Sequence, residues 1–467
     1  MQPEQPVQRM APFNSRVALG VGGGLVGATL TTLGLLLLSW AQMSGFLVAV
    51  FLVPILLPAS WPAFVRQARR ERNPRLAKFL LLALVLKLLG SLVRYWVSFH
   101  VYQGNVDAVG YHEFGMGLAA RFRAGDFSTG LPSLSGTDFI SFFTGLVYTV
   151  TGPSMYAGFL LYAWLSFWGM FCLYRAFTIV MPDGNRASYA RLLFLMPSML
   201  YWPSSIGKEA WMVFSLGLAA FGTARLITGR AWRGLAVAAV GLWLGTLVRP
   251  HVAGMAALGL VVAYLLARPP RRLGAAGPAV KLLALAVLVV LAGALLNQTK
   301  SYLQGKGIDP QDGVDSVLAE TQRRTNEGHS SFQAPSTGGG SLAAVPLAAV
   351  TILYRPFLFE AHNAQAAVTA LESTVLLCLT VARRRAIWQA VRHPRKRPYV
   401  AFVLIFALLF VVAFSSISNF GILARERTQL LPFFLVLLAV PAGRPRAAAP
   451  AAHEPAAAGA GQPASPA

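Results

Sequence analysis

Long apolar segments recur along most of this chain, and short polar or basic turns separate them. An α-helix needs about 20 apolar residues to cross a hydrocarbon core of about 30 Å. The pattern therefore predicts an all-α polytopic integral membrane protein with about 12 transmembrane helices, within a range of about 10–13. The expected spans are residues 17–40, 43–63, 78–98, 154–178, 190–203, 208–227, 233–248, 252–268, 279–297, 364–382, 399–416 and 422–441.

Two long intervals separate the predicted spans, at about residues 99–153 and 298–363. The first contains an apolar stretch at 139–152, which is too short to cross a membrane and is expected to form a re-entrant or interfacial helix. The second ends in an apolar part with the sequence LYRPF, which is expected to lie in the membrane interface. Residues 1–442 are thus predicted to form a single transmembrane domain, and the Ala/Pro-rich tail at 443–467 is predicted to be disordered.

The distribution of charge predicts the orientation. Charged residues make up only 12% of the chain, yet the net charge is +23. Cytoplasmic loops of membrane proteins carry an excess of Lys and Arg, so these residues indicate topology rather than nucleic-acid binding. The basic intervals expected in the cytoplasm are 66–78, 225–233, 268–272 and 383–397. This assignment places both termini in the cytoplasm and both long loops outside.

Motifs for several common chemistries do not occur. The two cysteines, Cys172 and Cys378, fall inside apolar segments, so no disulfide framework is expected. A Gly-rich phosphate loop, HExxH, CxxC and a nucleophile elbow are all missing from the sequence. ATP hydrolysis and zinc chemistry are therefore not indicated, and the sequence predicts neither a cofactor nor a metal.

Five cations are expected at or next to the outer ends of predicted spans. They are Lys208 in SSIGKEA, Arg249 in LVRPHV, Arg355 in LYRPF, and Arg425 with Arg427 in LARER. A cation near hydrocarbon is costly unless it pairs with an acidic group or binds a ligand. Arg can donate two parallel hydrogen bonds to a phosphate. The set predicts a site for an anionic ligand at the outer surface. Snorkelling or local ion pairs are the alternative for any single residue, although adjacent residues on a helix do not face each other.

The first long loop carries acidic residues in the sequence GNVDAVGYHEFG. Asp107 and Glu113 are candidates for a general base that acts on a sugar hydroxyl, and Asp107 is the stronger one. The alternative for Asp107 is an acidic helix N-terminus, where Asp is favoured in any case. His112 and His251 are candidate hydrogen-bond donors to phosphate, or plain interfacial histidines.

Two predicted spans also contain charges in their interior. Lys87 and Arg94 lie on one face of the third span, and Glu372 lies in the tenth. A structural Lys87–Glu372 ion pair is the preferred interpretation, and a proton path is the alternative.

With these features the chain resembles the Wzy-type polymerases of exopolysaccharide and O-antigen repeat units. The D-x-x-x-Y at Asp107 and Tyr111, followed by the span that opens with SSIGKEA, is similar to the EpsG-like branch. The resemblance implies a bacterial inner-membrane enzyme that transfers a growing glycan from one polyprenyl pyrophosphate to the next repeat unit. Arginines would bind the pyrophosphate, without a nucleotide sugar or a metal. The implied partners are the lipid-linked glycan, membrane lipid, and a chain-length regulator and flippase of the same pathway.

Two other classes remain open on the same residues. The chain more distantly resembles GT-C type glycosyltransferases that use a polyprenyl-phosphate sugar, in which an acidic residue of the first outer loop is the base. Those loops usually follow the first span, whereas more than one span precedes this loop. A transporter or flippase for a lipid-linked glycan would need the anion site but no base.

Overall fold

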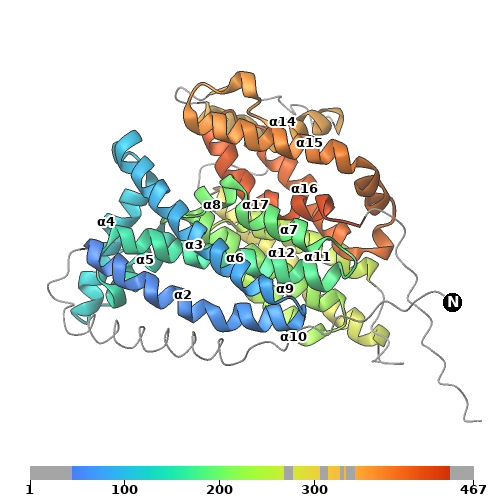
Figure 1. Cartoon of the computed structure of the whole chain (residues 1–467), viewed down its shortest axis with the longest axis horizontal. Coiled ribbons are helices and arrows are strands. Elements are labelled where there is room, and N and C mark those ends of the chain that lie inside the picture. The colour runs from blue at the N-terminus through green and yellow to red at the C-terminus, as the bar shows by residue number, and fades with distance from the viewer. Residues whose placement is uncertain (1–44, 268–276, 305–313, 327–330, 333–341, 442–467) are drawn as a thin grey trace, which may run out of the picture.

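The computed structural model describes residues 45–267, 277–304, 314–326, 331–332 and 342–441. The expected span at 17–40 and the expected disordered tail at 443–467 lie outside the described residues. The described residues form helices joined by turns, and their only β-type pairing is an isolated bridge between Ser331 and Asn419. The chain is thus an α-helical membrane protein, as the apolar pattern predicts (Figure 1).

Five described helices are long and apolar enough to cross a membrane. They are α2 (Gly45–Arg70), α3 (Pro74–Trp96, extended by a π-turn at Val97–Val101), α6 (Met155–Val180), α9 (Lys208–Ile227) and α15 (Ala364–Arg392). Further apolar helices complete the bundle: α10 (Ala231–Thr246), α11 (Pro250–Leu266), α12 (Gly277–Gln304), α14 (Val345–Tyr354), α16 (Pro398–Phe414) and α17 (Phe420–Leu438). The count of twelve spans stays a prediction.

Glycines allow the central helices to pack closely. A Cβ on Gly217 of α9 would lie 2.2 Å from the carbonyl oxygen of Gly169 in α6, and a Cβ on Gly222 would lie 2.2 Å from the backbone nitrogen of Ala238 in α10. Small residues at helix interfaces are typical of membrane bundles, where close backbone approach replaces the hydrophobic driving force. These contacts fix α9 between α6 and α10, and so fix the position of its first residue, Lys208.

The segment expected as one span at 190–203 is not one helix, so that prediction is wrong. It contains α7 (Arg186–Leu195) and the short α8 (Pro197–Tyr201). Between them Met196 is extended, with ψ at 127°, because a residue before proline is excluded from the helical region. From Trp202 to Gly207 the chain is buried and non-helical before α9 begins. Non-helical backbone is tolerated inside membrane proteins where it is buried or lines a cavity.

Buried charged side chains hold α8 in place. Lys87 Nζ donates to the Met199 carbonyl at 2.5 Å, while the Glu372 carboxylate accepts from the Ser198 amide and hydroxyl, both at 2.6 Å. The expected Lys87–Glu372 pair is therefore wrong, because each side chain binds α8 instead of the other. Arg427, fully buried, pairs with Glu372 at 3.5 Å.

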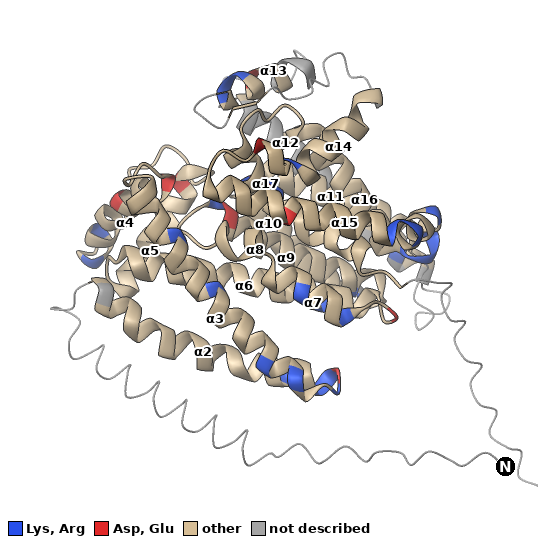
Figure 2. Cartoon of the chain, turned by 45° about the horizontal axis from the view of Figure 1, so that its top comes forward, with Lys and Arg blue, Asp and Glu red and all other residues tan. Residues whose placement is uncertain are grey.

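The basic turns lie together at one end of the bundle. An ion pair between Arg186 and Glu71, at 3.8 Å, joins the α6–α7 turn to the α2–α3 turn. Arg383, near the end of α15, donates to the Val440 carbonyl after α17. Figure 2 shows Lys and Arg gathered at the α2–α3 turn, along α7 and at the end of α15. The arrangement agrees with a common side for these turns, and the cytoplasmic assignment of that side stays a prediction.

Two shorter helices form a hairpin away from the basic turns (Figure 1). They are α4 (Asp107–Arg123) and α5 (Thr137–Thr151), and the second covers the apolar stretch expected at 139–152. A Cβ on Gly145 would lie 2.7 Å from Leu118 Cβ, so the two helices are in close contact. The hairpin packs α4 so that its first residue, Asp107, faces the bundle.

We expect cysteine labelling to place residues 101–138 and 299–340 on the outer side of the membrane. Residues 66–76 and 383–397 should lie on the cytoplasmic side. The physical reason is the excess of Lys and Arg in the second pair of segments. The measurement is reaction of single cysteines with an impermeant thiol reagent in whole cells and in lysed cells, with Cys172 and Cys378 removed. Labelling of 383–397 from outside would reverse the orientation.

Candidate functional site

A polar pocket of about 240 Å³ opens where four segments distant in sequence meet. We use "polar pocket" for the cavity lined by Asp107 and Tyr111 of α4, the stretch 205–209, Arg249 and Arg425, together with Arg94 and Tyr102. The α7–α8 break and the buried chain after α8 bring the stretch 205–209 to this cavity. Asp107, Lys208 and Arg249 all lie at helix beginnings, and Arg425 lies in the second turn of α17.

Ion pairs cross the polar pocket and tie its walls together. Arg425 Nη1 donates to Asp107 Oδ2 at 2.9 Å, and its Nε lies 3.3 Å from Glu209 Oε1. Arg249 Nη2 donates to the same Glu209 oxygen at 3.1 Å, and Nη1 donates to Glu426. Buried charges are costly without partners, which explains why each arginine here has acidic neighbours. The pairs considered from the sequence, between adjacent residues, are replaced by pairs between different helices.

The polar pocket keeps an excess of positive charge. Its lining contains four cations, Arg94, Lys208, Arg249 and Arg425, and two carboxylates, Asp107 and Glu209, so the balance is +2. Glu426, which binds Arg249 from outside the lining, lowers it to +1. Two of the four cations, Arg249 and Arg425, are committed to protein carboxylates, so an anionic ligand would bind beside a network that is already assembled.

The beginning of α9 adds a second attraction for anions. Gly207 at its N-cap is extended, with φ at 166°, and provides no side chain to accept from the first amides, while the Glu209 carboxylate in the first turn accepts from its own backbone amide. The first backbone N–H groups of a helix lack intrahelical partners, and the helix dipole favours negative charge there. Because residues 205–209 line the cavity, this helix end borders the polar pocket.

Tyr111 provides a neutral hydroxyl beside the carboxylates. Burial, together with the nearby charges of Glu209 and Asp107, raises the pKa of Tyr111. The phenol is therefore protonated at neutral pH and can donate a hydrogen bond. This places a donor next to Asp107 on the same helix.

The other candidates from the sequence lie elsewhere. Arg355 binds Glu360, with its Nε 2.9 Å and 3.1 Å from the two carboxylate oxygens, and packs over the Phe332 ring at 4.3 Å. Arg427 is buried against Glu372 and Ser373. The structure thus brings Lys208, Arg249 and Arg425 together, and separates Arg355 and Arg427 from them.

The histidines and the second acid also lie outside the lining of the polar pocket. His112 Nδ1 is 2.7 Å from the Tyr148 hydroxyl, and burial lowers the pKa of His112, so the ring is neutral at pH 7. Glu113 is exposed on α4. The His251 ring packs beside Phe414, with centroids 6.0 Å apart.

Arg94 is a site residue that the sequence analysis did not select. It lines the polar pocket, its Nη1 donates to the Tyr201 hydroxyl at 2.9 Å, and its guanidinium lies 4.7 Å from the Trp202 ring. Its Nε is buried and has no hydrogen-bond partner among the described residues. A buried donor without a partner is costly. Arg94 could contact a ligand in the cavity only through other parts of its side chain, because the buried Nε does not open onto it. The sequence did indicate Arg94 indirectly, because Arg94 and Lys87 lie seven residues apart on one face of α3. In the structure both side chains bind α8, Lys87 at Met199 and Arg94 at Tyr201.

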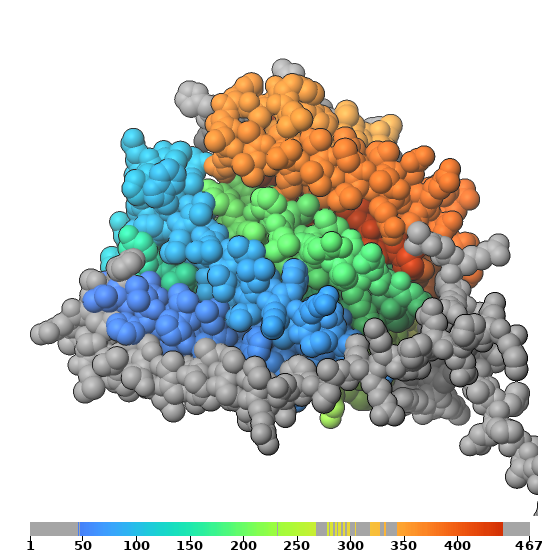
Figure 3. All heavy atoms as spheres, in the orientation of Figure 1, coloured from blue at the N-terminus to red at the C-terminus, as the bar shows by residue number. Residues whose placement is uncertain are grey.

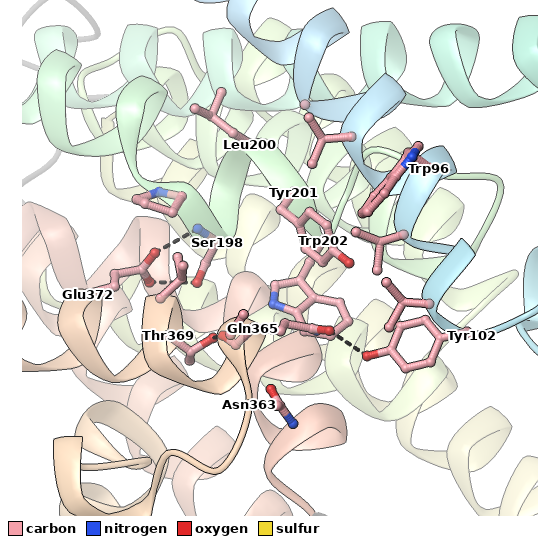
Figure 4. Close-up of a pocket in the computed structure, with 17 residues that line it drawn as sticks. Trp96, Tyr102, Ser198, Leu200, Tyr201, Trp202, Asn363, Gln365, Thr369 and Glu372 are labelled. Atoms are coloured by element: carbon pink, nitrogen blue, oxygen red, sulfur yellow. Dashed lines mark hydrogen bonds between the residues drawn. The ribbon is translucent and has the colours of Figure 1, made fainter. Parts of the chain in front are cut away.

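An apolar groove adjoins the polar pocket. It has a volume of about 550 Å³ and runs between α3 and α15 over α8. Figure 3 shows the surface hollowed between α3 (blue) and α15 (orange). Tyr102 and Trp202 line both cavities, and the Tyr102 hydroxyl donates to Gln365 of α15 (Figure 4). The two cavities therefore meet at these aromatic side chains.

The fold and the site define an α-helical membrane protein with a charged cavity beside an apolar groove. No group of three or more His, Cys, Asp or Glu residues suited to a metal ion occurs in the part of the chain that the structure describes. Comparisons with protein-family models, with curated proteins and with solved structures find no match to this chain.

Proposed function

We propose that the chain polymerises polyprenyl-pyrophosphate-linked oligosaccharide repeat units at the outer face of a bacterial inner membrane. The observation that supports this most is the polar pocket, in which a carboxylate at a helix beginning lies beside cations from three other segments. Glycosyl transfer from a lipid pyrophosphate needs both: an anion site for the leaving group, and a base for the attacking hydroxyl.

The charged side chains of the polar pocket have separate roles in this proposal. Lys208, Arg94 and the first amides of α9 bind the pyrophosphate of the donor. Asp107 accepts the proton of the acceptor sugar hydroxyl while the oxygen of that hydroxyl attacks the anomeric carbon of the donor. The bond from that carbon to the pyrophosphate oxygen breaks, and the polyprenyl pyrophosphate leaves with the electron pair. Negative charge that develops on the leaving group is stabilised by the same cations.

Arg425 couples the two parts of the reaction in this scheme. Arg425 binds both Asp107 and Glu209. A pyrophosphate in the polar pocket competes for its guanidinium and so weakens its hold on Asp107. The carboxylate then becomes a better proton acceptor when the donor is bound. Arg249, which bridges Glu209 and Glu426, is a positioning residue that keeps the network assembled.

A deletion strain separates this function from its two alternatives. We expect it to make single lipid-linked repeat units on the outer leaflet but no long polymer, because only the joining step is lost. The measurement is extraction and mass analysis of lipid-linked glycans, with leaflet assignment by a membrane-impermeant lectin, in a strain complemented with the intact chain as control. A repeat unit that lacks one sugar would indicate a GT-C type transferase. Complete units confined to the inner leaflet would indicate a flippase.

A further inference from the structure

The apolar groove has the size and lining of a ligand site. Its volume of about 550 Å³ falls within the range of roughly 300–1,000 Å³ that small-molecule pockets occupy. Val93 and Trp96 of α3 form one wall, Val368 of α15 forms the other, and Leu200 of α8 lies between them. Figure 4 shows Trp96 of α3 on the opposite side of the cavity from Glu372 of α15.

A second apolar cavity of about 380 Å³ continues the groove along α15. It shares Pro197, Val368 and Glu372 with the groove and extends to Leu371 and Val375. Val368, Leu371 and Val375 follow one stripe of the helix, because residues three and four apart lie on the same face. The concave apolar surface is therefore long and narrow, and one of its ends is the polar pocket.

The two cavities together complement a molecule with one long apolar part and an anionic head. The polar pocket carries an excess of positive charge, and the groove offers a nearly continuous apolar surface. Tyr102 and Trp202, which border both, are the side-chain types favoured where apolar and polar regions of a membrane meet. An ordinary phospholipid has two acyl chains, so a single narrow groove matches it less well than it matches a single-chain phosphate lipid.

We propose that the apolar groove binds the isoprenoid tail of the polyprenyl pyrophosphate lipid whose pyrophosphate lies in the polar pocket. The proposal rests on the proposed function, since it assigns the tail of the same substrate. The lipid enters from the bilayer between α3 and α15, and the Tyr102–Gln365 hydrogen bond closes the groove beside the phosphate. Tail length then contributes to affinity through van der Waals packing against the groove walls, because each further isoprene unit within the groove adds close contacts that bulk lipid does not provide.

The test compares a long-chain polyprenyl pyrophosphate with a pyrophosphate that carries only two or three isoprene units. Binding to the full chain in nanodiscs is measured by native mass spectrometry and by competition. We expect the long lipid to bind at least about tenfold more tightly than the short one, because its tail makes more packing contacts in the groove. Val93→Trp and Val368→Trp, which fill the groove, should remove most of this difference.

Matched controls use residues on the same helices that lie outside the groove. Leu89 on α3 is 50% exposed, against 55% for Val93, and Val381 on α15 is 53% exposed, like Val368. Leu89→Trp and Val381→Trp should keep the preference for the long lipid. Photo-crosslinking from a benzophenone side chain at position 93 should capture the long lipid in preference to bulk lipid. The same probe at position 89 should show no preference between the long lipid and bulk lipid.

Three results would overturn the proposal: equal affinity of the intact chain for both lipids, an undiminished preference in both groove variants, or full displacement of the long lipid by phosphatidylglycerol. The outcome is separable from that of the proposed function. A preference for the long tail in a chain whose deletion leaves polymer unchanged would reject the polymerase and retain the tail site. A polymer defect without any preference for the long tail would retain the polymerase and reject the tail site.

Discussion

Asp107→Asn is expected to lower the rate of glycan transfer at saturating substrate by roughly 10²- to 10⁴-fold, the contribution typical of a positioned general base. Asn has the same shape and can still accept a hydrogen bond from Arg425, but it cannot take a proton. Because the base acts in the chemical step, kcat should fall while the KM for the lipid-linked unit changes little. The measurement is polymer formed per unit of correctly inserted protein, at several concentrations of purified lipid-linked repeat units.

The variant should fold normally, since the Asp107–Arg425 pair is partly exposed and such pairs contribute within about 0–1 kcal/mol. Asp126→Asn is the matched control, because Asp126 follows α4 in an exposed turn and accepts from the Ser128 amide at 2.9 Å. Its activity should equal that of the intact chain. A raised KM with unchanged kcat in Asp107→Asn would make Asp107 a binding residue, and full activity would remove it from the reaction.

Most helices were predictable because a membrane imposes length and apolarity on each of them. The expected segments at 43–63, 154–178, 208–227 and 399–416 correspond to α2, α6, α9 and α16 within a few residues at most boundaries. The α7–α8 break was not predicted, because Met196 and Pro197 stand among apolar residues and hydropathy does not record a change of backbone direction. The cavities follow from that break, so hydropathy could not reveal them either.

The candidate site was predictable only in part. Lys208, Arg249 and Arg425 were selected as cations at helix ends, and the structure brings them into one cavity. Their acidic partners were not identified, because the pairs join positions as far apart in sequence as Asp107 and Arg425. Arg427 could have been separated from Arg425 on helical geometry alone: two residues apart on a helix, their side chains point to nearly opposite faces.

Glu372→Ala is expected to destabilise the protein by about 3–5 kcal/mol, the cost typical of removing one partner from a buried ion pair. The side chains of Glu372 and Arg427 are 2% and 0% exposed, so the remaining guanidinium would stay buried without its carboxylate. The Ser198 amide and hydroxyl would also lose their acceptor, which loosens α8. The measurement is reversible unfolding of the purified protein in mixed micelles with increasing denaturing detergent.

The double variant Glu372→Leu with Arg427→Met is expected to recover much of this stability. A buried ion pair can often be replaced by apolar side chains of similar volume at little cost, whereas half of a pair cannot. Glu320→Ala is the control for loss of a partly exposed acid, because Glu320 binds Arg323 and Arg324 on α13 (Val314–Thr325), and its unfolding should match the intact chain. If Glu372→Ala unfolded at the same detergent concentration as the intact chain, the Glu372–Arg427 pair would not be what holds α8. If the double variant were as unstable as Glu372→Ala, the hydrogen bonds to Ser198 would account for the loss instead of the uncompensated charge.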